Sequence, residues 1–203
     1  MILGLCGKYC SGKSEAARIL GEEGFHIIDV DALGHEVLEE HAREVAAVFG
    51  EQILSAQGAA GGTGDRGTVN RRKLGRVVFA DSAKLKKLEA IVHPRVAEKA
   101  VKLLEEARRG GNPTVIHAAL LFTGGLDRLC DHIIIIKAPL LDRINRGLSR
   151  DSLGITAVFR RIWKQRSLIP QSSSLPADTI TVKNSGSRRE LREAVLEAVS
   201  RLT

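Results

Sequence analysis

The segment GKYCSGKS, from Gly7 to Ser14, follows the short apolar run ILGLC and decides which fold we expect for this chain. Its pattern is G-x-x-x-x-G-K-S, placed after a candidate buried strand and before a candidate helix, as in loops that bind phosphate groups. The glycines permit backbone conformations that turn several N–H groups inward, and the N-terminus of the following helix adds to this anion site. The segment therefore predicts a site for the phosphates of a nucleotide.

The ligand expected at this loop is ATP with Mg²⁺. We expect Lys13 to reach the β- and γ-phosphates and to act in catalysis, and the Ser14 hydroxyl to bind Mg²⁺. The loop residues expected to bind ATP are Gly7, Cys10, Ser11, Gly12, Lys13, Ser14 and Glu15. A glycine-rich turn that binds nothing is the alternative, and the candidate strand and helix on either side argue against it.

The composition limits the classes of protein to which the chain can belong. Of its 203 residues 43% are hydrophobic, which is enough for a buried core. No apolar run reaches the length of about 18 residues expected of a membrane helix, and the N-terminus lacks the pattern of a secretory signal. The three cysteines, Cys6, Cys10 and Cys130, form no C-x-x-C pair. We therefore expect a cytoplasmic protein with reduced thiols and no membrane partner.

The basic balance of the chain suggests anionic ligands. The formal net charge is +7, which fits either a nucleic-acid surface or sites for small, highly charged anions. Aromatic residues make up only 3% of the chain, so few side chains are available to stack on bases. This contrast favours small anions and argues against nucleic acid.

The order of apolar segments predicts the fold class. Strands are expected at residues 2–6, 25–29, 114–118, 133–136 and 179–182. The isoleucine run at 133–136 shows no alternation, as expected for a strand buried on both faces of a parallel sheet. Because helical patterns separate the strands, we expect an α/β fold with a doubly wound parallel sheet of about five strands.

The same pass along the chain predicts its domain organisation. We expect residues 1–30 and 110–203 to form a nucleotide-binding core, and residues 31–109 to form a mostly helical insertion. Within the core, residues 141–174 have an apolar stripe opposite a basic face, so we expect a basic helical lid there.

Two carboxylates follow the second expected strand. Asp29 and Asp31 would lie at its carboxyl end, where ligands collect in parallel sheets. A carboxylate there can orient a hydroxyl and accept its proton, or help to hold Mg²⁺. Asp31 capping the following helix is an equally good interpretation. The segment DALG also fits the D-x-x-G of GTPases, but the chain contains no N-K-x-D for guanine.

Basic side chains outside the loop form the remaining candidates. Arg146 and Arg150 are four residues apart, so they share one face of a helix and could close over ATP during phosphoryl transfer. A solvated basic face is the alternative. His93 precedes Pro94, where a histidine more often has a structural role at a helix junction than a role as a ligand.

Taken together, seven segments resemble the dephospho-coenzyme A kinase family almost from end to end. Each segment is short and weak evidence alone, but all seven occur in the order typical of the family. The segments are GKYCSGKS (7–14), IIDVDALGHEV (27–37), GTVNRRKLGRVVF (67–79), LEAIVHPRV (88–96), ALLF (119–122), RGLSRD through RRIWKQ (146–165) and ADTITVKNSG (177–186).

The resemblance implies transfer of the γ-phosphoryl group of ATP to the ribose 3′-hydroxyl of dephospho-coenzyme A. It implies that Asp31 is the base and that the helical insertion binds this small-molecule substrate. Catalytic residues would be Asp31, Lys13, Arg150 and Arg146, and metal ligands Ser14 and Asp29. Substrate contacts would be Asp31, His35, Arg71, His93 and Arg95, and Asn184 and Gly186 would lie near the adenine of ATP. We expect a monomer or a small homo-oligomer.

The chain departs from the family pattern at several positions. Glu15 stands where the family usually has Thr, so its carboxylate has to turn away from the phosphates. Ala119 and Thr123 replace a proline and an acid, and His35 replaces an arginine. Two alternatives therefore stay open. One is a kinase for another hydroxyl, and the other is an ATP- or nucleic-acid-binding protein without activity.

Overall fold

The structure of the chain is a computed structural model that describes residues 1–55, 67–122, 124–151, 175 and 178–202. These residues divide into two compact units. One unit is built from Met1–Val30 and Lys102–Thr203, and the other from Asp31–Val101. The expected boundary at 109 therefore differs from the structure, in which 102–109 group with the first unit. The functional roles of the two units stay predictions.

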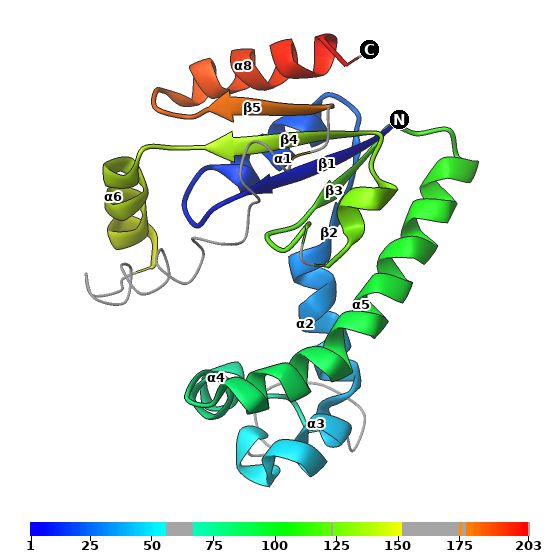
Figure 1. Cartoon of the computed structure of the whole chain (residues 1–203), viewed down its shortest axis with the longest axis vertical. Helices are drawn as coiled ribbons and strands as arrows, with labels where there is room; N and C mark the ends of the chain where they lie inside the picture. The colour runs from blue at the N-terminus through cyan, green and yellow to red at the C-terminus, as the bar shows by residue number, and fades with distance from the viewer. Residues whose placement is uncertain (56–66, 123, 152–174, 176–177, 203) are drawn as a thin grey trace. The chain divides into compact units, whose positions relative to one another are not determined.

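The first unit is built on a parallel sheet of five strands. The strands are β1 (Ile2–Gly7), β2 (His26–Asp29), β3 (Thr114–His117), β4 (His132–Lys137) and β5 (Thr179–Lys183), in the order β2-β3-β1-β4-β5 (Figure 1). All four pairings are parallel. This confirms the expected doubly wound sheet. Because the strands are parallel, all five carboxyl ends lie at one edge of the sheet.

Helices α1 (Lys13–Glu22) and α8 (Arg188–Ser200) contribute to one hydrophobic core with the sheet. The residues that meet there include alternate positions of the central strands, such as Leu3 and Leu5 of β1 and Ile134 and Ile136 of β4. Alternation within a strand sends the intervening residues to the opposite face. There, a Cβ on Gly4 would lie 2.9 Å from atoms of both Leu121 and Cys130. Short η2 (Leu126–Leu129) and α6 (Leu140–Asp151) complete the described elements of this unit.

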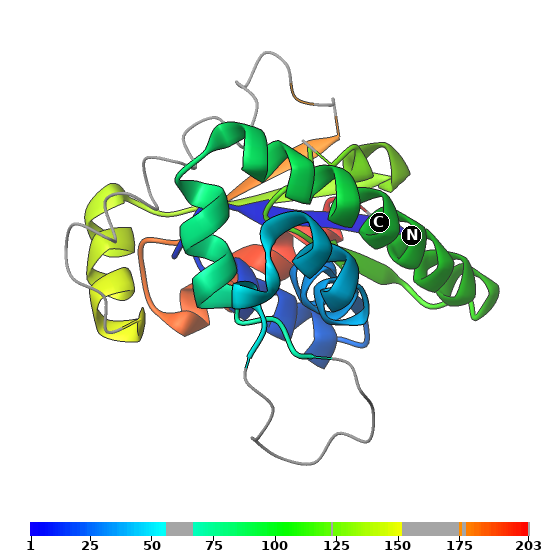
Figure 2. The same ribbon diagram turned by 90° about the horizontal axis from the view of Figure 1, so that it is seen from below.

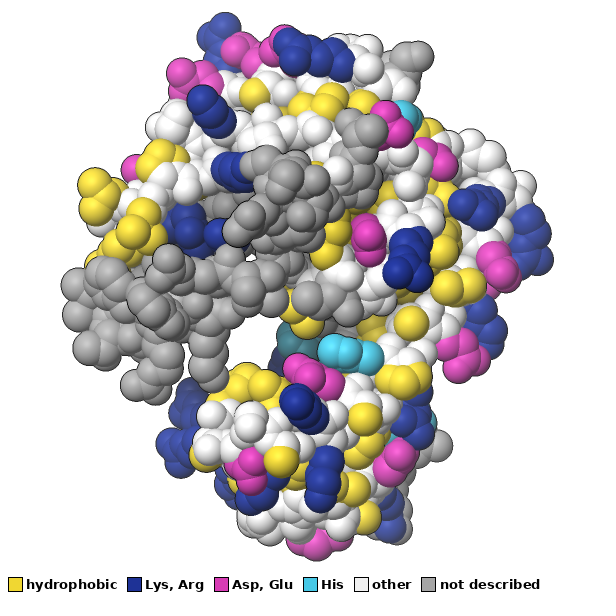
Figure 3. All heavy atoms as spheres, in the orientation of Figure 1, with side chains coloured by type: hydrophobic (Ala, Val, Ile, Leu, Met, Phe, Trp, Pro, Cys, Tyr) yellow, Lys and Arg dark blue, Asp and Glu magenta, His cyan; other side chains and the backbone are white. Residues whose placement is uncertain are grey.

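The exposed side of α8 carries both signs of charge (Figure 3). Arg189 pairs with Glu193 at 2.9 Å, and Arg192 reaches Glu22 of α1 at 2.8 Å. These ion pairs are exposed, so each is worth only about 0–1 kcal/mol. The helix begins with a capping box between Ser187 and Glu190, and hydrogen bonds from the cap lower the pKa of the Glu190 carboxyl.

The second unit is helical, in line with the expected insertion. Its elements are α2 (Val30–Glu40), α3 (Ala42–Phe49), η1 (Glu51–Ile53), α4 (Arg71–Phe79) and α5 (Ser82–Arg109), the first and last of which continue into the other unit. A separate core joins α2, α3, η1 and α4, and the partly buried residues of α5 pack against it. No helix within the described ranges is long and apolar enough to cross a membrane.

Helix α5 is one continuous helix (Figures 1 and 2), and Pro94 lies inside it. The expected helix junction beside His93 is therefore wrong, because His93 lies inside α5. Proline removes one backbone donor and crowds the preceding turn. Arg95 hydrogen-bonds the Ile91 carbonyl there and also donates to both carboxylate oxygens of Glu44 on α3, each at 3.0 Å. These contacts tie α5 to α3 beside the proline.

Candidate active site

The phosphate loop joins β1 to α1, and its backbone has the shape of an anion site. Cys10 has φ 56° and Gly12 has φ 97°, so both are left-handed, whereas Ser11 between them is not. Alternation of this kind directs successive N–H groups to one side of the chain. Gly12 also serves as the N-cap of α1, so the positive end of that helix adds to the same site.

Asn184, which follows β5, fixes this loop in place. Its side chain is buried and donates from Nδ2 to the carbonyl oxygen of Ser11 at 2.8 Å. The contact is so close that a Cβ atom on Gly12 would lie 2.1 Å from the same nitrogen. Gly12 is therefore required both by its φ and by the approach of Asn184. The side-chain nitrogen of Asn184 therefore binds the loop, and its expected position near the adenine of ATP stays a prediction.

Two arginines of α6 also make contacts here, one with the loop and one with Asn184. Arg143 donates from Nε to the Tyr9 carbonyl oxygen at 2.8 Å, and Arg146 lies 3.4 Å from the backbone oxygen of Asn184. Arg143 is only 7% exposed, and burial lowers the pKa of its guanidinium, which nevertheless stays protonated at neutral pH. Among the described residues, Nη2 of Arg143 and Nη1 of Arg146 are buried without a hydrogen-bond partner.

Arg143 is a site residue that sequence reasoning missed. The signal was present, because residues 143 and 146 follow the helical spacing i, i+3 and so share one face of α6. The backbone of Arg150 lies in α6, but its side chain and the lid residues 152–174 lie outside the described residues. Thr123 lies outside them as well.

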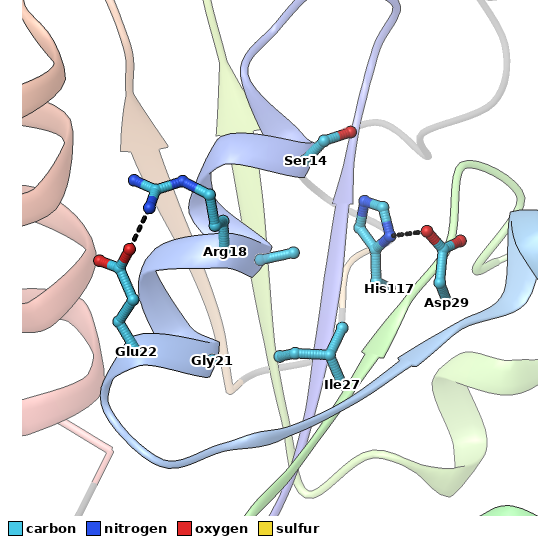
Figure 4. Close-up of a pocket in the computed structure, with 8 residues that line it drawn as sticks. Ser14, Arg18, Gly21, Glu22, Ile27, Asp29 and His117 are labelled. Carbon is cyan, nitrogen blue, oxygen red and sulfur yellow. Dashed lines mark hydrogen bonds and ion pairs between the residues drawn. The ribbon is translucent and has the colours of Figure 1, made fainter.

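Beside the loop is a pocket of about 370 Å³ between α1 and the strands β2 and β3 (Figure 4). Asp29 and His117 meet in it, with His117 Nδ1 3.3 Å from Asp29 Oδ2. Sequence reasoning singled out Asp29 but missed His117, although TVIH ends its strand at the same edge of the sheet. The other residues lining the pocket are Ser14, Ala17, Arg18, Gly21, Glu22 and Ile27.

The donors in this pocket suit Mg²⁺ once phosphate oxygens are present. Ser14 is exposed and the Asp29 side chain is 45% exposed, so both can offer oxygen to a hard cation. No group of three His, Cys, Asp or Glu residues within the described ranges could hold a metal by itself. Ser14 and Asp29, the two expected metal ligands, both line this pocket.

The carboxylate of Glu15 is bound by arginines. Arg18 of the same helix donates to it at 2.8 Å, and Arg188 at the start of α8 lies 2.5 Å from it. These contacts balance a negative charge that would otherwise repel phosphates beside the loop. They give a physical account of how the loop tolerates glutamate at this position.

The expected acceptor-binding residues lie on three helices of the second unit. Asp31 and His35 are exposed one turn apart on α2, with Asp31 in its first turn. The helix dipole stabilises a carboxylate in the first turn. Asp31 lies within the helix, however, and is not the N-cap residue that precedes it. Arg71 is the exposed first residue of α4, and His93 is exposed on α5. Their assignment to a substrate stays a prediction.

Comparisons with known proteins place the chain in a family. A family model described as "Dephospho-CoA kinase" matches residues 1–190. A dephospho-CoA kinase from Bacillus licheniformis is 32% identical over 94% of this chain and 90% of its own length. A second, from Thermobifida fusca, is 35% identical over 96% of this chain and 92% of its own.

Solved structures are similar over the same span. A crystal structure of a Thermus thermophilus protein has a TM-score of 0.78 and 30% identity, covering 100% of this chain and 98% of its own. A dephospho-CoA kinase from Campylobacter jejuni has a TM-score of 0.69 over 99% of this chain and 96% of its own, and at 22% identity it supports the fold alone. With the phosphate loop, the five-stranded parallel sheet and these relatives in agreement, the chain belongs to the dephospho-CoA kinase family.

Proposed function

We propose that this protein transfers the γ-phosphoryl group of ATP to the 3′-hydroxyl of the ribose of dephospho-CoA, which gives coenzyme A and ADP. The observation that carries the proposal is the conformation of the phosphate loop, in which Cys10 and Gly12 are left-handed. Asn184 holds the loop through a hydrogen bond of 2.8 Å from its Nδ2 to the Ser11 carbonyl oxygen. Family membership supports the choice of acceptor.

The loop and α6 would bind the triphosphate together. Backbone N–H groups from Gly7 to Glu15 would surround the phosphates, and Lys13 would reach the β- and γ-phosphates. Nη2 of Arg143 and Nη1 of Arg146 are buried donors that no described residue satisfies. A buried donor left without a partner costs about 1–3 kcal/mol, so an anionic ligand is a natural partner for this pair. Arg150 would add to the charge.

A magnesium ion bound to ATP would be held by the Ser14 hydroxyl and the Asp29 carboxylate. When bound, it would neutralise charge on the phosphate oxygens. The chain's own residues would orient the nucleotide around it, because positioning and electrostatic stabilisation are most of what phosphoryl transfer asks of a protein. The adenine would lie near the backbone of Asn184 to Gly186.

Asp31 would accept the proton of the attacking hydroxyl, since it lies two residues beyond Asp29 and is exposed. His35, Arg71, His93 and Arg95 would bind the substrate. For Arg95 this role has a condition, because its guanidinium already pairs with Glu44 and the substrate would have to share it. We also propose that the protein acts in the cytoplasm as a monomer or small homo-oligomer, in line with its three free cysteines.

The test is a comparison of acceptors at fixed ATP and Mg²⁺, with ADP formation as the readout. Dephospho-CoA should be phosphorylated, whereas adenosine and simple sugars should give ADP at the background rate. Lys13→Ala serves as the inactive control, because it removes the side chain expected to contact the β- and γ-phosphates. A preference for a nucleoside or sugar would support a kinase for another hydroxyl, and ATP binding without ADP formation would indicate an inactive protein.

A further inference from the structure

The carboxyl ends of β2 and β3 bring a buried histidine beside an acidic residue. We infer that His117 is a positioning residue for Asp29 and fixes the carboxylate that would bind the magnesium of ATP. This inference rests on the proposed function and deepens it, because it names a further residue on which metal binding depends.

The strand register sets up the pair. In the parallel ladder Asp29 lies opposite His117, and Leu5 of β1 lies opposite His117 on the other side. His117 is two residues beyond Val115, so its side chain shares the face of the sheet that packs under α1. Ser14 and Ala17 of α1 line the same pocket. The two side chains are therefore brought together by the sheet itself and not by a loop.

The two side chains differ in burial, and this difference suits one as support and the other as ligand. The His117 side chain is 5% exposed and the Asp29 side chain 45%. Close packing restricts the rotamers of a buried ring, so His117 offers Nδ1 at a fixed position. Figure 4 shows the ring of His117 directed at one oxygen of Asp29, while the other oxygen points away from the ring.

This arrangement is how proteins commonly orient a metal-binding carboxylate. A donor that holds one oxygen sets the direction of the other, and the loss of such a partner typically weakens metal binding by about 10- to 100-fold. Arg18, another cation that lines the pocket, donates to Glu15 and Glu22. Nδ1 is the ring nitrogen of His117 that faces Asp29, at 3.3 Å from Oδ2, so a proton on Nδ1 would lie on the Asp29 side of the ring.

The experiment compares three substitutions of His117 that differ in where they place a donor. In His117→Asn the amide nitrogen can occupy the position of Nδ1, whereas in His117→Gln it occupies that of Nε2, and His117→Leu has no donor. His132→Asn is the matched control, since His132 is a half-buried histidine at the first residue of β4, at the opposite end of the strands. The readout is the affinity for ADP by calorimetry with and without Mg²⁺, together with Mn²⁺ binding to the ADP complex by electron paramagnetic resonance.

We expect the factor by which Mg²⁺ tightens ADP binding to fall about tenfold in His117→Leu and His117→Gln, with weaker Mn²⁺ binding. His117→Asn and His132→Asn should stay within about twofold of the unmodified protein. The inference is overturned if all three variants keep the Mg²⁺ effect, or if they lose ADP affinity equally with and without metal, which would indicate a structural role. Should His117→Leu fail to fold, the Asn and Gln pair still decides. Because the readout is ADP binding, a failure to phosphorylate dephospho-CoA would refute the proposed function without altering this result.

Discussion

Replacing Gly12 with alanine tests how the phosphate loop is held. The new Cβ would lie 2.1 Å from Asn184 Nδ2, so Asn184 has to move and its buried hydrogen bond to the Ser11 carbonyl is lost. An unsatisfied buried amide costs about 1–3 kcal/mol. Alanine at φ 97° adds about 1–2 kcal/mol of backbone strain. We therefore expect Gly12→Ala to lower the free energy of unfolding by about 2–5 kcal/mol, a large part of the stability of an ordinary domain.

Gly24→Ala is the matched control for that measurement. Gly24 has a similar φ of 87°, but a Cβ there meets nothing within 4 Å. Gly24→Ala should therefore show the backbone strain alone, and the lower entropy of the unfolded chain offsets part of it. We expect the free energy of unfolding to fall by about 1 kcal/mol. Urea unfolding followed by circular dichroism gives both values, and calorimetry gives ADP affinity, which should fall at least ~10-fold in Gly12→Ala only. Equal destabilisation of the two variants, or intact ADP binding in Gly12→Ala, would refute the reasoning.

Three further predictions concern the expected base Asp31, the contact of Arg143 with the phosphate loop, and the thiols of Cys6 and Cys130. Asp31→Asn should lower turnover by ~10²–10⁴ with ADP affinity unchanged, as for a lost general base, and unaltered turnover would remove Asp31 from that role. Arg143→Leu should weaken ADP binding by ~10-fold or more, because a hydrogen bond from a charged donor to the loop carbonyl is worth ~1.5–3 kcal/mol. The control is Arg189→Leu, which changes an exposed arginine and should leave ADP binding unaltered. Burial raises the pKa of Cys6 and Cys130 to about 12, with nearby carboxylates adding to the effect at Cys130. At about pH 8 their thiolate fraction is then ~10³-fold below that of an ordinary thiol, so both should resist alkylation until the chain unfolds. Rapid labelling of the buried Cys6 or the partly buried Cys130 in the native protein would contradict this expectation.

Local patterns were sufficient to predict the sheet and the loop. Each strand is a short apolar run, and the isoleucines of β4 are buried at all four positions of that run. The spacing of glycines, lysine and serine in the loop is a local requirement of phosphate binding, so it is visible without any knowledge of tertiary contacts.

The contacts that hold the loop could not be predicted in the same way. Asn184 and Ser11 are 173 residues apart, and Arg143 and Tyr9 are 134 apart, so both contacts depend on strand order and helix placement. Periodicity assigns a residue to an element and a face, but it does not say which distant carbonyl that residue will meet.

Two further differences have physical causes. The pairing of Asp29 with His117 follows from β2 lying beside β3 in register, which no single-strand pattern specifies. The continuity of α5 through Pro94 depends on packing against its core and on the contacts of Arg95, and these override the local tendency of proline to end a helix.

The most direct test of the central claim is to follow the phosphoryl group itself. Protein, Mg²⁺, ATP and dephospho-CoA are incubated together, and the product is examined by mass spectrometry and ³¹P nuclear magnetic resonance. The account predicts ADP and an acceptor heavier by one phosphate, carried as a monoester on the ribose 3′-oxygen. Recovery of unmodified dephospho-CoA beside intact ATP, or a phosphate at any other position of the acceptor, would contradict it.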